Sequence, residues 1–173
     1  MTEREIRLGV IGAGNMASAL VRGLIGQGTV SPANVWISSP SGPRKPLQDT
    51  GAHCTRDNGE VARNADVLIL AVKPYVMGTA IESIRGTLKP NTLVISVAAG
   101  ISINQLSAML SPGGSGWRII RVMPNTPAGI GQGASAMCLG GLAKAADADL
   151  AARLFQAVGI VEVVGEAMMD GEL

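Results

Sequence analysis

The sequence is poor in residues on which several classes of protein function depend. Its 173 residues include one histidine, two cysteines, two tryptophans, one tyrosine and one phenylalanine, and the formal net charge is only +1. Nucleic-acid binding requires a basic surface and, for single strands, aromatic rings on which bases stack. Both are scarce in this chain, so we expect no nucleic-acid partner.

Sites built on histidine or cysteine are poorly supported as well. Cys54 and Cys138 are far apart without a Cys-x-x-Cys motif, and His53 is the only histidine. We therefore predict no metal site and no disulfide framework, and expect two packed thiols. The single histidine and the lack of a Gly-x-Ser-x-Gly motif leave a serine-hydrolase triad without a basis. No catalytic residue is assigned in this chain.

Long apolar segments are also lacking. Residues 1–5 read Met-Thr-Glu-Arg-Glu and lead straight into an apolar strand, so no signal-peptide core is recognised. No uninterrupted apolar run approaches the ~20 residues that span a bilayer. We expect a soluble, cytoplasmic protein that does not associate with membranes.

Glycine, by contrast, is abundant, and its most informative occurrence lies near the N-terminus. The 23 glycines are about twice the usual share and lie at the ends of apolar runs. Residues 10–17 read Val-Ile-Gly-Ala-Gly-Asn-Met-Ala. The apolar residues from Ile6 to Ile11 predict a buried strand, and the spacing of Met16, Leu20 and Leu24 predicts a helix. The glycines therefore occupy a strand-to-helix turn.

This turn has the residue types that a pyrophosphate requires. Gly12 permits a turn closed to most side chains, Gly14 leaves room for a phosphate against the backbone, and Ala17 lets the helix pack close to the sheet. The unpaired N–H groups at the helix N-terminus then face the anion. The same spacing of glycines could also occur in a turn that binds no ligand, but the strand before the turn and the helix after it favour dinucleotide binding.

The rest of the chain predicts one α/β domain without internal repeats. Amphipathic helices are predicted at residues 74–88, 102–110 and 145–158, the second opening with a capping box formed by Ser102 and Gln105. Near-continuous apolar strands alternate with these helices, which indicates a doubly wound, mostly parallel, Rossmann-like sheet covered on both faces. The further strands are predicted at residues 35–38, 67–72, 93–97, 119–123, 135–139 and 160–164.

The end of the second predicted strand bears on the choice of cofactor. In NAD-binding domains an acidic residue about 20 positions after the glycines binds the ribose hydroxyls. Residues 37–44 read Ile-Ser-Ser-Pro-Ser-Gly-Pro-Arg and contain no acid. Ser39, Ser41 and Arg44 can instead bind a 2′-phosphate, which favours NADP, with NAD as the alternative. Lys45 could replace Arg44, or the segment is merely a turn with Arg44 in solvent.

Other strand ends supply further candidates, since ligands of open α/β sheets bind at the carboxyl ends of strands. Lys73, between Val72 and Pro74, either contacts the cofactor or is solvated. The small residues of segment 96–100 suit a flat nicotinamide or ribose, or else close helix packing. Within residues 124–127, Pro-Asn-Thr-Pro, two prolines hold two polar side chains at a strand end, as a binding loop or as a rigid structural turn.

In this order, the motifs resemble pyrroline-5-carboxylate reductases, and the resemblance runs from about Ile6 to Asp170. It is carried by residues 12–17 (Gly-Ala-Gly-Asn-Met-Ala), 71–74 (Ala-Val-Lys-Pro), 96–100 (Ser-Val-Ala-Ala-Gly) and 121–127 (Arg-Val-Met-Pro-Asn-Thr-Pro). The last motif is the most specific, because dinucleotide-binding folds in general do not carry it.

The resemblance implies an NADPH-dependent oxidoreductase of proline biosynthesis that reduces the cyclic imine 1-pyrroline-5-carboxylate to L-proline. A hydride would pass from NADPH to the imine carbon, so that positioning and charge stabilisation suffice. The resemblance also implies that Asn58 contacts the cofactor and that residues 123–127 border the nicotinamide. With the residues argued above, the candidate cofactor-binding residues are Gly12, Ala13, Gly14, Asn15, Met16, Ser39, Ser41, Arg44, Asn58, Val72, Lys73, Pro74, Ala99, Gly100 and Asn125.

The sequence departs from that family at its C-terminus. There, Glu166 and Asp170 would lead into a Ser-Gly-Ser-Gly-Pro-Ala segment and a helical domain that binds the substrate and forms a homodimer. Here the chain stops at Leu173. We expect residues 1–165 to form the NADP-binding domain and residues 166–173 to begin a helix leading to that absent domain. The chain should then bind NADPH with negligible turnover and be a monomer, or associate weakly through exposed residues 167–169.

Two other functions remain open. One is a stand-alone, non-catalytic NADP-binding or regulatory module. The other is a related imine or β-hydroxyacid reductase, which would share the glycine turn but would not account for residues 123–127.

Overall fold

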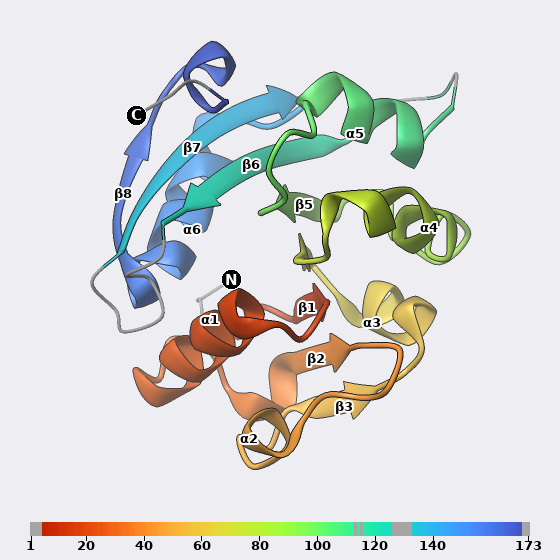
Figure 1. The fold of residues 1–173 in the computed structure, drawn as a ribbon, viewed down its shortest axis with the longest axis vertical. Coiled ribbons are helices and arrows are strands. Elements are labelled where there is room, and N and C mark those ends of the chain that lie inside the picture. The colour runs from red at the N-terminus through yellow and green to blue at the C-terminus, as the bar shows by residue number, and fades with distance from the viewer. Residues whose placement is uncertain (1–4, 113, 115, 126–132, 171–173) are drawn as a thin grey trace.

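The computed structural model of the chain describes residues 5–112, 114, 116–125 and 133–170 (Figure 1). Within these ranges all strands belong to one sheet with the order β3-β2-β1-β4-β5-β6-β7-β8. Strands β1 to β6 run parallel, β7 pairs antiparallel with β6, and β8 pairs parallel with β7. The strands are β1 Leu8–Ile11, β2 Val35–Ser38, β3 His53–Thr55, β4 Val67–Leu70, β5 Leu93–Ser96, β6 Arg118–Pro124, β7 Gly133–Gly141 and β8 Gly159–Val163.

Helices cover both faces of this sheet and divide the core in two. Leu8 and Val10 of β1 pack with the helices α1 and α6, whereas the next residue, Ile11, packs with α3, α4 and α5. The expected doubly wound, mostly parallel sheet is thus confirmed. The α-helices are α1 Asn15–Gly26, α2 Lys45–Gln48, α3 Asn58–Asn64, α4 Met77–Glu82, α5 Ile103–Leu110 and α6 Ala145–Phe155, and the 3₁₀ turns are η2 Pro32–Asn34, η3 Pro74–Val76, η5 Gln156–Val158 and η6 Glu166–Met168.

The helix predicted over residues 74–88 is wrong in its extent. The segment forms η3, then the short helix α4, and continues as turns after Glu82. The Ser83 hydroxyl donates to the Ala80 carbonyl oxygen (2.6 Å), which competes with helical hydrogen bonding, and Gly86 disfavours further helix. Ile84 and Leu88 are nevertheless buried as the apolar stripe predicted.

The other predicted helices are found close to their expected positions. Ser102 caps α5, and its side chain and that of Gln105 form the predicted reciprocal capping box. Helix α6 ends at Phe155, and the remaining predicted residues 156–158 form η5. In the described ranges no helix is both long and apolar enough to cross a bilayer.

The C-terminal segment differs from expectation. The helix predicted to start within residues 166–173 is present only as the 3₁₀ turn η6, and residues 171–173 lie outside the described residues. Of the three residues expected to form an exposed apolar end, Ala167 and Met168 are exposed, but Met169 is 5% exposed and packs into the α3–α5 side of the core. This segment is therefore anchored on the domain.

Three short elements, α2, α3 and β3, were not predicted. Strand β3 has only three residues, none fully buried, so it carries no apolar pattern. Helix α3 begins after Asp57, whose carboxylate accepts a hydrogen bond from the Gly59 N–H at 2.8 Å. An Asp at this position with Glu60 three residues later is a helix-start signal that the sequence did contain.

Candidate functional site

Two adjoining hollows lie at the end of β1, the strand that has β2 as its neighbour on one side and β4 on the other. Such a switch point is where open α/β sheets bind ligands. The first, about 520 Å³, is here called the serine hollow and is lined by Ala13, Gly14, Asn15, Ser18, Ser39, Ser41, Gly42, Arg44, Pro46, Leu47 and Lys73. The second, about 620 Å³, is called the strand-end hollow and is lined by residues 12–17, Ser39, Pro40, residues 71–74, Val76, residues 97–99, Met123 and Pro124.

The two hollows form one groove, because they share part of their lining. Asn15 and Lys73 line both hollows, and so does the end of β2 through Ser39. Ala13 and Gly14 complete the shared wall. The glycine turn therefore lies where the two hollows of this groove meet.

The geometry of the turn requires glycine at position 12. Gly12 has φ +108°, and a Cβ there would collide with the Ala71 carbonyl oxygen of the neighbouring segment. Its N–H donates to the Ser38 carbonyl oxygen at 2.9 Å, which draws the turn toward the end of β2. Only a residue without a side chain fits this place.

Gly14 serves a different purpose. It has an ordinary φ of −75° as the N-cap of α1, and a Cβ built on it meets nothing within 4 Å. A side chain at Gly14 would thus occupy open groove, so its absence leaves the backbone accessible to a ligand. The first turn of α1 contains no acidic residue, so the positive end of the helix dipole is left for an anion.

The serine hollow has the chemistry of an anion site. Ser39 and Ser41 line it together with Arg44 and Lys73, and none of its described lining residues is acidic. A turn closed by the Gly42 N–H on the Ser39 carbonyl oxygen (3.0 Å) carries the two serines. Hydroxyls and a guanidinium together suit a phosphate monoester.

Three of the predicted residues line neither hollow. The Asn58 side chain accepts from the Ser38 hydroxyl at 2.7 Å and donates to Ser83 at 3.1 Å, tying β2 to α4. Asn125 Oδ1 accepts from the Ala134 N–H at 2.9 Å, and Gly100, at φ +73°, follows the lining residue Ala99. Thr126 and Pro127 lie outside the described residues.

Some lining residues escaped the sequence reasoning. Ser18 lies one helical turn after Gly14, and this spacing was a signal that could have located it. Met123, by contrast, belongs to the segment that the resemblance placed beside the nicotinamide, and it lines the strand-end hollow because β6 continues past Arg121, which pairs with the last residue of β5, Ser96.

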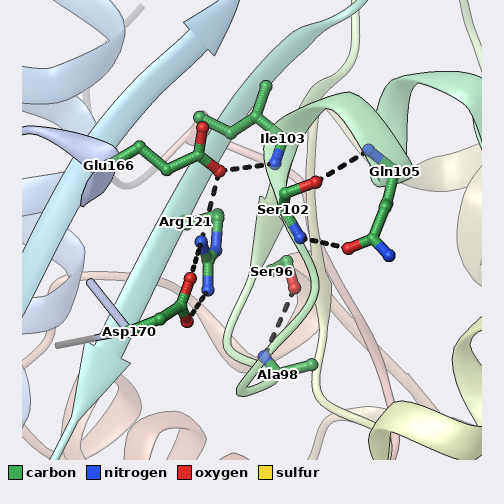
Figure 2. A network of polar contacts seen from close by, with 8 residues as sticks. All are labelled: Ser96, Ala98, Ser102, Ile103, Gln105, Arg121, Glu166 and Asp170. Carbon is green, nitrogen blue, oxygen red and sulfur yellow. Dashed lines mark hydrogen bonds and ion pairs between the residues drawn. The ribbon is translucent and has the colours of Figure 1, made fainter. Parts of the chain in front are cut away.

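Beside the far end of the groove, a buried arginine joins three segments of the chain (Figure 2). Arg121 of β6 is 1% exposed and contacts Asp170 through both guanidinium Nη atoms, at 2.8 and 3.1 Å, and Glu166 Oε1 at 3.2 Å. Glu166 Oε1 also accepts from the N–H of Ile103, at the start of α5, at 2.7 Å. The hydrogen bonds that Arg121 donates to Asp170 raise the pKa of Arg121 against the opposing effect of burial.

Both cysteines are free thiols, Cys138 buried and Cys54 partly buried. Cys138 faces Arg121 across the β6–β7 pair, and burial raises the pKa of its thiol. Burial also raises the pKa of Cys54 on β3. Among the described residues, no group of three or more histidine, cysteine, aspartate or glutamate side chains could hold a metal ion.

The parallel sheet with a glycine turn at its switch point defines a Rossmann-like domain, and comparison with known proteins agrees. Residues 7–100 match the family described as "NADP oxidoreductase coenzyme F420-dependent", and the chain belongs to this family. Among individual proteins, it is 37% identical over 168 residues to a pyrroline-5-carboxylate reductase of Arabidopsis thaliana, an alignment that covers 96% of this chain and 59% of the relative.

Solved structures give the same result. A pyrroline-5-carboxylate reductase from Coxiella burnetii superposes with a TM-score of 0.86 at 32% identity, covering 95% of this chain and 61% of the other. The Plasmodium falciparum pyrroline carboxylate reductase, solved with NADP bound, superposes with a TM-score of 0.85 at 31% identity, covering 96% and 60%. The chain thus spans about 60% of the length of the relatives that it matches.

Proposed function

We propose that this chain is the cofactor-binding part of an NADPH-dependent reductase that converts 1-pyrroline-5-carboxylate to L-proline. The observation that carries the proposal is the 37% identity to a pyrroline-5-carboxylate reductase along nearly the whole chain. The substrate, the product and the pathway of proline biosynthesis come from these relatives, whereas the cofactor site is argued from this chain's own residues.

The groove fits NADPH in three parts. Gly14 at the N-terminus of α1 would hold the pyrophosphate, because the backbone is open there and the helix dipole is positive. In the serine hollow, Arg44 would supply a forked cation and Ser39 a hydroxyl for the 2′-phosphate. In the strand-end hollow, residues 97–99 would hold the nicotinamide, since they are small enough for a flat ring.

The reaction needs little from the protein beyond placement. When bound, NADPH supplies a hydride for the imine carbon of a substrate whose nitrogen is protonated, and the products are the amine and NADP⁺. The residues at the ends of β4 and β5 would hold the cofactor ring, which would be a positional contribution to catalysis. We assign no catalytic residue within the chain.

The remaining expectations are part of the same proposal. We propose that residues 1–165 form the NADP-binding domain and that residues 166–173 lead toward a substrate and dimerisation domain like that of the longer reductases. Accordingly, this chain by itself is expected to be a monomer or a weak oligomer in the cytoplasm, with NADPH binding but negligible turnover. Sedimentation that showed a tight dimer would contradict the first expectation.

Ligand titration and a steady-state assay test the proposal together. We expect NADPH to bind more tightly than NADH. Binding can be measured through the fluorescence of Trp36, which lies on β2 and stacks on His53 with 4.7 Å between the ring centroids. Absence of binding of either coenzyme would refute the cofactor site. Turnover of pyrroline-5-carboxylate close to that of a complete reductase would refute the assignment of this chain as the cofactor part alone.

A further inference from the structure

Arg121 is an unusual residue to find inside a sheet. Among the largest fully buried side chains, it is the only one with a charge in the described part of the chain. It lies on β6 between Ser96 of β5 and Cys138 of β7, at the level where β5 ends. A buried guanidinium persists only where carboxylates compensate its charge.

The compensating carboxylates come from far along the chain. Asp170 binds the guanidinium through both carboxylate oxygens, and Glu166 adds a third contact while holding the N-terminus of α5 through Ile103 (Figure 2). Arg121 Nε has no hydrogen-bond partner in the described ranges. The orientation of the guanidinium is therefore set by its Nη atoms, and mainly by Asp170.

The same cluster borders the loop that lines the far end of the groove. The loop begins at Ser96, whose hydroxyl accepts from the Ala98 N–H at 3.3 Å, and Ala98 and Ala99 line the strand-end hollow. At its other end, the loop leads into α5, whose first residue Ile103 donates its N–H to the same Glu166 oxygen that contacts Arg121. The loop thus runs between two points that the Arg121 cluster holds, Ser96, which pairs with Arg121, and Ile103, which is bound to Glu166.

We propose that Arg121, oriented by Asp170, is a positioning residue for the nicotinamide half of the cofactor, and that it holds the loop of residues 97–100 through Ser96 at its start and Glu166 at its end. This inference rests on the proposed function, because it assigns the nicotinamide to the strand-end hollow. Arg121 touches neither hollow itself. It fixes the backbone against which the ring lies, whereas the serine hollow is built without it.

The test compares two ligands on the 173-residue chain. NADPH occupies both hollows, whereas adenosine 2′,5′-bisphosphate carries only the half assigned to the serine hollow. In Asp170→Asn, the dissociation constant of NADPH should rise about tenfold, whereas that of the bisphosphate should stay within about twofold of the unmodified chain. A residue that only stabilises the fold would not change the ratio of the two constants.

Two further variants sharpen the result. Arg121→Lys keeps the charge but loses the fork, and it should shift the ratio in the same direction. Should Arg121→Lys fail to fold, Asp170→Asn decides, since Asp170 is half exposed. Asp66→Asn is the matched control, because Asp66 also pairs with a cation, Lys89 at 2.9 Å, next to the start of β4, and its ratio should not change.

The outcomes separate the two levels of the proposal. If Asp170→Asn leaves both constants unchanged, or weakens both ligands equally, the positioning role of Arg121 is overturned while the cofactor site stands. If the unmodified chain binds neither ligand, the proposed function fails, and the inference fails with it.

Discussion

The two ends of the groove are built in different ways. The serine hollow is assembled mostly from two short segments, the turn into α1 and the loop between β2 and α2. The far end of the strand-end hollow depends on Arg121 and on carboxylates 45 and 49 positions later in the chain. The first end is determined locally, and the second depends on the completed fold. Substitutions at the two ends should therefore differ in what they disturb.

The largest effect on stability is expected at the glycine turn between the two ends of the groove. Gly12→Ala should lower the free energy of unfolding by about 3 kcal/mol, since the residue has φ +108° and its Cβ would collide with the Ala71 carbonyl. Urea unfolding followed by circular dichroism measures this. Gly14→Ala is the matched control: it should cost only about 0.5–1 kcal/mol yet weaken NADPH binding. Equal destabilisation by both would contradict the distinction.

A second substitution tests whether the serine hollow acts on its own. Arg44→Ala should raise the dissociation constant of NADPH about tenfold, or about 1.4 kcal/mol, by removing a charge-assisted contact to the 2′-phosphate. The constant for NADH, which lacks that phosphate, should not change. Lys45→Ala is the control, because Lys45 pairs with Asp49 at 3.1 Å on α2. If Lys45→Ala alone weakens NADPH binding, Lys45 is the phosphate ligand.

The buried hydroxyl at the end of β2 should have a smaller effect. Ser38 is fully buried and donates to Asn58 at 2.7 Å, so Ser38→Ala should lower the free energy of unfolding by about 1 kcal/mol. A double-mutant cycle with Asn58→Ala, measured by urea unfolding, should give a non-additive pair. Strict additivity would show that the hydrogen bond contributes nothing measurable.

The smallest effect is expected at low pH and concerns the ion pair of Arg121 and Asp170 beside the strand-end hollow. The hydrogen bond from Arg121 lowers the pKa of Asp170 in the folded chain. Its stabilisation is therefore present above the ordinary aspartate pKa of about 4 and is lost as the pH falls through the lower folded value. The urea midpoint of the unmodified chain should approach that of Asp170→Asn in this acidic range. A difference that persisted to the lowest pH would contradict the ion pair.

The locally determined half could be predicted from the sequence, and the reason is physical. The glycines of the turn, and the two residues of the capping box at Ser102, lie close together in the sequence, and the apolar runs of the central strands reflect burial on both faces. The helix over residues 74–88 was overextended because apolar spacing persisted through turns in which Ser83 and Gly86 end the helix.

The nonlocal half could not be predicted in the same way. Arg121 was recognised only as part of a motif, because its burial and its partners Glu166 and Asp170 depend on how the C-terminal segment packs. Asn58 was expected at the cofactor, but its amide is used between Ser38 and Ser83. Whether it also contacts the cofactor stays a prediction.

The common lining of the two hollows has a consequence for the strength of binding. Because Ala13 to Asn15 belong to both, the two ends of the groove meet along the turn. When one part of a flexible ligand is bound at one end of the groove, its other part is therefore present at the opposite end at a high effective concentration. Two weak fragments, each specific for one end, should gain affinity far beyond either alone once they are joined by a linker that follows the backbone of the turn.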